Sequence, residues 1–238
     1  MIKKLLPIAI ILLSALTASA ETQTLKVDRF QKIRVIGPLN VDCVYNPDSV
    51  GYIAVDSPNP GRISWVEAST SGNKLKLQLR LPDDMRQGVI PVESDLPRVK
   101  VYTNYLTDVS NEGDSIVRVI TSTNVPSFTA RLIGNGYLSV RGIDTEKLNV
   151  ELITGRGTVA VHGTADEENI RLAGVGTIEA DGVEAREAKV KTTGSGNIGV
   201  FATKTLKIYG AGSGTIFVKG SPEISRKMAI GVKLQPIE

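Results

Sequence analysis

The chain has 238 residues, with 28 Lys and Arg against 25 Asp and Glu, one His and one Cys. This near-neutral balance argues against a nucleic-acid partner, and a single cysteine excludes an internal disulfide. Aromatic residues are only 5% of the chain while 23 residues are glycine, a composition that favours stacked small β units over a helical core.

Residues 1–20 have the pattern of an export signal. Lys3 and Lys4 precede an apolar run from Leu5 to Leu13, and Ala18-Ser19-Ala20 supplies the small residues of a cleavage site. The apolar run is shorter than the roughly 20 residues that a membrane span needs, and no later stretch reaches that length. We therefore expect an exported protein of the periplasm, the extracellular space or the cell surface, with no transmembrane segment in the mature chain.

Residues 21–119 are expected to be rich in β-strand but to lack a repeat. Alternating apolar segments are separated there by clusters of Gly, Pro and Asn. The predicted strands are Lys32–Ile36, Leu39–Tyr45, Tyr52–Val55, Ile63–Val66, Leu75–Leu81 and Val99–Tyr102. Alternation places the only cysteine, Cys43, on the same face as Val41 and Tyr45, which predicts a buried and inert thiol. This part is expected to lead into the repeat that follows and to cap it.

A repeat of about 20 residues follows. Five segments share a Gly-x-Gly start and an alternating strand: Gly134–Gly142, Gly155–Gly163, Gly174–Gly182, Gly194–Ala202 and Gly212–Gly220. Their starts lie 21, 19, 20 and 18 residues apart. Each segment is preceded by another short strand, and both inward positions of the second strand are apolar in all five units. At Leu148, Val150 and Leu152 the alternation slips by one residue, which suggests a bulge.

Two short strands cannot bury an apolar face alone, so consecutive units must stack with equivalent strands in register. The predicted fold is all-β: a right-handed parallel β-helix with glycine columns at its corners. An antiparallel sandwich with hairpin turns is the alternative, but it does not require equivalent residues at equivalent offsets. The expected organisation is a signal peptide at 1–20, a β-rich N-terminal part at 21–119, the solenoid at 120–223 and a C-terminal cap at 224–238.

Three features together are similar to a known family. The segment from Phe30 to Val41 after the signal, the segment Gly72–Leu77 and the later Gly-x-Gly coils resemble proteins described as "putative auto-transporter adhesin, head GIN domain", which are common in Bacteroidetes. The resemblance covers nearly the whole mature chain. It implies an exported β-helical protein named for adhesion, and it supplies no catalytic residues.

Stacking converts outward residues into surface columns. On the first strand of each unit, one offset carries Arg131, Arg171, Lys191 and Tyr209, and the neighbouring offset carries Lys189 and Lys207. Such a basic stripe suits an anionic polymer, either an acidic polysaccharide or lipopolysaccharide phosphates. The alternative is a solvated face whose lysines discourage edge pairing, with Glu151 as an interruption. The connections between coils are expected to carry acids, among them Glu167, Glu168 and Glu187.

The outer face of the second strand offers three aromatic residues, Tyr137, Phe201 and Phe217, which could stack on sugar rings. Scattered exposed aromatics without a function are the alternative. The single histidine, His162, is expected between Arg141 and Asp181, an arrangement that favours an ion pair over a general-base dyad because no cleft or oxyanion donor is implied. No metal or other cofactor is expected, since one His and one distant Cys cannot form a zinc site.

These patterns favour a non-enzymatic exported protein that binds a polysaccharide or a cell-surface glycan. The alternatives are a structural envelope scaffold that stacks end to end and a carbohydrate-active β-helix enzyme. Such an enzyme needs clustered outward carboxylates, and only Glu179 and Asp181 approach that arrangement.

Overall fold

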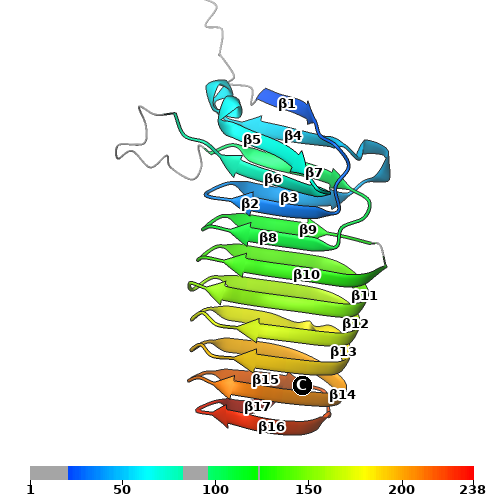
Figure 1. Ribbon diagram of the computed structural model, residues 1–238, viewed down its shortest axis with the longest axis vertical. Helices are drawn as coiled ribbons and strands as arrows, with labels where there is room; N and C mark the ends of the chain where they lie inside the picture. The colour runs from blue at the N-terminus through cyan, green and yellow to red at the C-terminus, as the bar shows by residue number, and fades with distance from the viewer. Residues whose placement is uncertain (1–20, 83–95, 123) are drawn as a thin grey trace, which may run out of the picture.

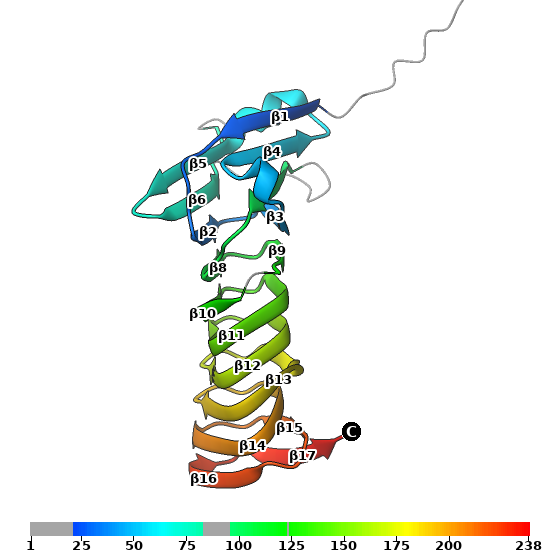
Figure 2. The same ribbon diagram turned by 90° about the vertical axis from the view of Figure 1, so that its right-hand side faces the viewer.

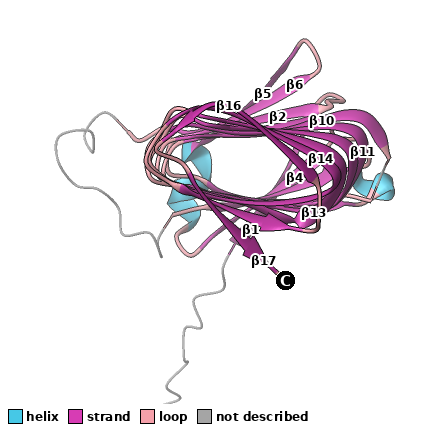
Figure 3. Ribbon diagram, turned by 90° about the horizontal axis from the view of Figure 1, so that it is seen from below, coloured by secondary structure: helices cyan, strands magenta, loops and turns pink. Residues whose placement is uncertain are grey.

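The computed structural model describes residues 21–82, 96–122 and 124–238, so the expected export signal lies outside the described part of the chain. The described residues form one 17-stranded sheet that coils into a flattened tube. Seen along its axis in Figure 3, the tube has two long walls that face each other. The coils turn in the right-handed sense, as Figures 1 and 2 show together, and the predicted parallel β-helix is confirmed.

The strands fall into two walls. The first wall contains, from the N-terminal end, β5 (Val66–Ser71), β6 (Lys74–Leu79), β2 (Lys32–Ile36), β8 (Asp108–Glu112), β10 (Val125–Ile133) and, last, β16 (Glu223–Ile230). The second wall contains β1 (Glu21–Lys26), β4 (Tyr52–Ser57), β7 (Arg98–Thr103), β3 (Asn40–Tyr45), β9 (Ile116–Ile120) and, last, β15 (Thr215–Lys219) and β17 (Lys233–Ile237). Two short 3-10 helices, η1 (Pro47–Ser49) and η2 (Pro60–Trp65), flank β4.

Four long strands join the walls in the middle of the tube. They are β11 (Tyr137–Thr154), β12 (Thr158–Leu172), β13 (Thr177–Thr192) and β14 (Asn197–Ala211). Each begins in the second wall, bends, and ends in the first, and each pairs in parallel with its neighbours over both parts. The suggested irregularity near Leu152 is present, because the register shifts between Leu132 and Ile133, which pair with Leu152 and Thr154.

The coils continue on both sides of the Gly-x-Gly repeat. Strands β8 and β9 form a coil with a Gly113-x-Ser115 corner, and β2 and β3 form another around Gly37. Between β3 and β8 the chain leaves the stack, forms β4 to β7, and returns beneath its own earlier coil. Strands β16 and β17 add a last coil at the other end.

Close stacking explains the glycine column at the corner. A Cβ on Gly194 would lie 1.9 Å from the carbonyl oxygen of Gly174, and one on Gly214 would lie 1.9 Å from that of Gly196. No side chain fits at such distances, so the coils approach this closely only where glycine stands. Each coil therefore places its two strands directly above the next pair.

Inward side chains fill the tube in rows that run along its axis. One row runs through the second wall as Val41, Val117, Leu138, Val159, Ile178, Ile198 and Ile216, all of them nearly inaccessible to solvent. Cys43 occupies the neighbouring row and is buried as predicted, and burial raises the pKa of its thiol far above the ordinary value. Asn111 also lies in the core, where its side-chain amide donates to the carbonyl oxygen of Ser115 at 2.9 Å.

The predicted strand Ile63–Val66 is wrong, because Ile63 to Trp65 lie in the 3-10 helix η2 and β5 begins only at Val66.

Glu168 also differs from its expected place. Glu168 was expected in a solvated connection, but β12 is continuous through it and carries its side chain inward. There it follows Leu148 and precedes Ala188 in a core row, and it is 1% exposed. The register, and not the local charge of Asp166, Glu167 and Glu168, decides which of the three is buried.

Candidate functional site

The outer face of the first wall carries two adjacent columns of polar side chains that run the length of the tube. Column one consists of Lys76, Arg34, Ser110, Arg131, Glu151, Arg171, Lys191, Tyr209 and Lys227. Column two consists of Lys74, Lys32, Asp108, Thr129, Asn149, Asn169, Lys189, Lys207 and Ser225. The pairing register thus aligns the basic residues as the repeat predicted.

In the N-terminal half of this wall, acids pair with the two arginines, whereas Lys32, Lys74 and Lys76 form no ion pair with a described residue. Arg34 donates to Glu112 at 2.5 Å and Arg131 to Glu151 at 2.6 Å. Burial pulls the pKa of Glu112 upward, but hydrogen bonds from Arg34 and Ser110 outweigh it and leave this pKa below its ordinary value. Arg131, one of the predicted ligand-binding cations, is therefore engaged within the protein.

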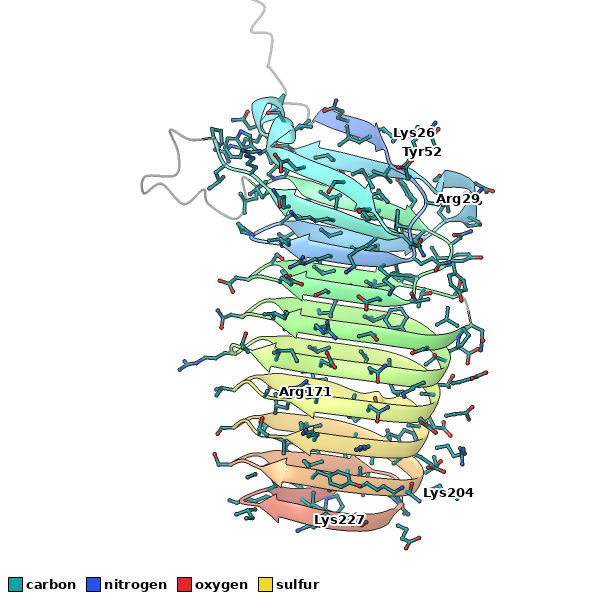
Figure 4. The ribbon with its side chains drawn as sticks, in the orientation of Figure 1. Lys26, Arg29, Tyr52, Arg171, Lys204 and Lys227 are labelled. Carbon is teal, nitrogen blue, oxygen red and sulfur yellow. The ribbon has the colours of Figure 1, made fainter. Side chains whose placement is uncertain are left out.

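In the C-terminal half the two columns contain no acid. We call Arg171, Lys189, Lys191, Lys207 and Lys227 the basic ladder. Among the described residues no carboxylate forms an ion pair with any of the five. The Lys189 ammonium lies 5.2 Å from the ring centroid of Tyr209, a cation–π contact between neighbouring coils. Figure 4 shows Arg171 and Lys227 on this face, on different coils.

The structure therefore brings together five of the predicted residues, Arg171, Lys189, Lys191, Lys207 and Tyr209. Sequence reasoning missed Lys227, which was assigned to a cap. A signal for it existed, since Lys227 follows Tyr209 by the same 18 residues that separate Tyr209 from Lys191.

Beside the ladder lies a shallow groove of about 170 Å³. The groove spans three coils. Column two borders it on one side, and a third column borders it on the other side, formed by Glu167, Glu187 and Thr205. The residues from column two are Asn169, Lys189 and Lys207, and Glu168 and Ala188, whose side chains face the core, complete the lining. The groove thus has an acidic and hydroxylic side and a basic and amide side.

The three aromatic residues predicted on the second wall do not form one surface. Tyr137 lies in register with Ile116 and Thr158, three coils before β14. Phe217 lies in register with Gly199 of the preceding coil. Phe201 lies in register with Lys219, whose ammonium is 5.6 Å from the centroid of the Phe201 ring. Phe201 and Phe217 are therefore neighbours, whereas Tyr137 stands apart.

One of the two expected neighbours of His162 differs in the structure. Arg141 lies beside it as predicted, but a register shift places Gly182 beside it instead of Asp181. The imidazole covers this glycine so closely that a Cβ there would lie 2.1 Å from Nδ1. In residues 21–82, 96–122 and 124–238, no three His, Cys, Asp or Glu side chains form a group that could hold a metal ion. In the same ranges no helix is long and apolar enough to cross a membrane.

Comparison with known proteins places this geometry in context. A family model described as "Putative auto-transporter adhesin, head GIN domain" matches residues 29–222. A solved structure of a putative adhesin from Bacteroides fragilis is similar, with a TM-score of 0.70, 20% identity, and coverage of 92% of this chain and 97% of that one. A putative lipid binding protein from Parabacteroides distasonis gives a TM-score of 0.70, 21% identity, and coverage of 93% and 98%. None of the curated proteins matches the chain.

Proposed function

Because the chain belongs to the putative auto-transporter adhesin, head GIN domain family, we propose that it is an exported, non-enzymatic binding protein that attaches to an anionic polymer through the basic ladder. The single observation that carries this proposal is the row of five cations on successive coils of one wall, none of which forms an ion pair with a described carboxylate. Acidic polysaccharide and lipopolysaccharide phosphate share the chemistry that such a row recognises.

The distribution of charge supports this choice of face. Isolated surface cations cost little and need no function, but here the two arginines of the N-terminal half pair with Glu112 and Glu151, whereas the five ladder cations lie on adjoining coils and form no ion pair with a described residue. Their spacing follows the coil rise of about 4.8 Å, which is shorter than the Debye length of about 8 Å at physiological ionic strength. Adjacent ladder residues therefore repel one another, and a bound polyanion would relieve that repulsion.

The proposal is tested by the binding of the mature protein to immobilised polyglucuronate and polyphosphate, with dextran as the uncharged polymer. We expect binding to both polyanions, none to dextran, and a steep loss of affinity with added salt. The variant Arg171→Gln/Lys191→Gln/Lys207→Gln should lose most of this binding.

A matched control exists on the second wall. The variant Arg98→Gln/Lys100→Gln/Lys233→Gln removes the same charges from β7 and β17, where the side chains face away from the ladder. It should retain near wild-type affinity. Equal losses in the two variants would show that only net charge matters, and no polyanion binding by the wild type would overturn the proposal.

A further inference from the structure

The groove beside the basic ladder has a regular construction. Each of three consecutive coils contributes one residue to each side: Glu167 and Asn169 from β12, Glu187 and Lys189 from β13, Thr205 and Lys207 from β14. Because equivalent residues stack, the groove runs along the tube axis and not along the strands. A ligand that follows it meets a similar pair of side chains at every coil.

The two sides differ in chemistry. Lys189 and Lys207 supply ammonium donors, and Asn169 an amide. Opposite them, Glu167 forms no ion pair with any described residue, whereas Glu187 is held by Arg186 at 2.8 Å. The hydroxyl oxygen of Thr205 is buried and has no hydrogen-bond partner in the described part of the chain.

A simple polyanion does not explain this arrangement. Glu167, which forms no ion pair with any described residue, would repel it, whereas Glu187 is already paired with Arg186 and adds little attraction or repulsion. Carboxylates on one side of a groove, with cations and an amide on the other, suit a ligand that carries both anionic groups and hydroxyl groups. Hydroxyls donate to carboxylate oxygens, and such charge-assisted hydrogen bonds are stronger than neutral ones.

We propose that this groove binds three consecutive residues of a linear polymer of acidic sugars, which lies along the tube axis with one ring per coil. The sugar carboxylates face Lys189 and Lys207, and ring hydroxyls donate to Glu167 and Glu187. Successive pyranose rings joined by glycosidic oxygens repeat at a distance comparable to the coil rise of about 4.8 Å, so ring and coil stay nearly in step over three units. This inference rests on the proposed function and specifies its ligand.

Titration calorimetry with glucuronic acid oligomers of one to six units tests the orientation and the span. Affinity should rise up to three units and change little beyond them, because the groove spans three coils. Polyphosphate chains of matched charge lack hydroxyls and should bind more weakly than the oligomers. A steady rise of affinity through six units, equal for both polymers, would contradict a three-ring site.

Removing an acid gives the sharpest test. Glu167→Ala should weaken binding of the three-unit oligomer about fivefold through loss of a charge-assisted hydrogen bond, while it should strengthen polyphosphate binding through loss of a repulsive charge. The control Glu146→Ala removes an exposed acid outside the groove lining and should leave the oligomer affinity unchanged.

The two proposals fail in different ways. If Glu167→Ala tightens the oligomer and polyphosphate alike, the groove is only part of an electrostatic surface, and the sugar-specific inference is overturned while the anionic-polymer proposal stands. If neither polymer binds the wild type, the proposed function itself fails.

Discussion

Each end of the solenoid has strand edges that could pair with another chain, and the two ends differ in how these edges are protected. At the N-terminal end the parallel coils give way to antiparallel pairing, because β4 pairs with β7, β1 with β4, and β5 with β6 in antiparallel register. At the C-terminal end β16 and β17 continue the parallel pattern and then stop, and no described strand pairs with their outer edges. Figure 2 shows the extra layer at one end only. Antiparallel strands cover one end, and no described strand covers the other, which we call the open end.

The covered end buries its apolar residues. Ile53 and Val55 are fully buried, and η2 brings Ile63 and Trp65 over the tube, where they are 5% and 8% exposed. Asn59 caps this 3-10 helix by accepting from the backbone N–H of Gly61 at 3.1 Å, a contact that fixes its first turn.

The open end relies on side-chain chemistry. Ile224 continues a core row but is 44% exposed. Arg226 and Pro236 stand in register with the buried Ile208 and Val218, at positions where every earlier coil has an apolar residue. An inward charge and a proline without an N–H are devices by which natural sheets prevent edge pairing. The comparison teaches that the edges of a parallel solenoid can be protected by a covering layer of strands or by inward residues that disfavour pairing.

The largest expected loss of stability is for a substitution in the middle of the glycine column at the corner, compared with the same substitution at the end of that column. Gly194→Ala forces a Cβ to within 1.9 Å of the Gly174 carbonyl oxygen and should destabilise the fold by about 3–5 kcal/mol. Gly37→Ala adds a Cβ with nothing within 4 Å, so only its φ of +79° is costly, at about 1 kcal/mol. Urea unfolding of both variants measures the difference, and equal losses would refute close stacking as the reason for the column.

The next largest loss of stability is expected at the N-terminal end of the solenoid, and the matching substitution at the C-terminal end should cost less. Trp65→Ala should lower the free energy of unfolding by about 3–4 kcal/mol, because it opens a cavity under the N-terminal layer. Ile224→Ala, at a position already 44% exposed, should cost less than about 1 kcal/mol. Thermal unfolding followed by circular dichroism checks this order, and a larger loss for Ile224→Ala would mean that the open end is covered in solution.

An inward carboxyl group in the middle of the tube sharpens the contrast with Arg226. Both carboxyl oxygens of Glu168 are buried and have no hydrogen-bond partner among the residues that the structure describes. Burial raises the pKa of Glu168 well above its ordinary value, and the negative charge of Asp181 raises it further. Glu168→Leu, which restores the residue type of Leu148 and Leu206, should stabilise the protein at neutral pH by about 1–3 kcal/mol.

The sign of the pH dependence follows from this raised pKa. Below the unfolded-state value of about 4.3 both states bind the proton, and Glu168 carries no ionic penalty. As the pH rises through that value the unfolded state releases the proton while the folded state retains it, so stability falls with pH up to the raised folded pKa. The stability difference between Glu168→Gln and the wild type should therefore grow from pH 4 to pH 7, and a constant difference would contradict a neutral buried carboxyl.

Glu168 also shows how far sequence alone could reach. The 20-residue repeat predicted the stacking, the inward rows and the alignment of Arg171 with Lys191, because identical coils leave little freedom of register. It could not predict the side to which Glu168 points, since that depends on how far β12 continues. Nor could it predict the shift that places Gly182 beside His162, or the coil of β2 and β3 inserted between β6 and β8, because these depend on contacts between distant segments.

The smallest expected effect on stability concerns the open end itself. Arg226→Val with Pro236→Val removes the inward charge and restores a backbone N–H to β17, so that both outer edges become regular, apolar templates for another chain. The free energy of unfolding should change by less than about 1 kcal/mol, because both positions are exposed. Light scattering across a concentration series should nevertheless show association that the wild type lacks at the same concentrations. The control Lys227→Val with Gln235→Val adds the same apolar surface on the outward side, and equal association there would show that general hydrophobicity, and not the two inward residues, governs the behaviour of this end.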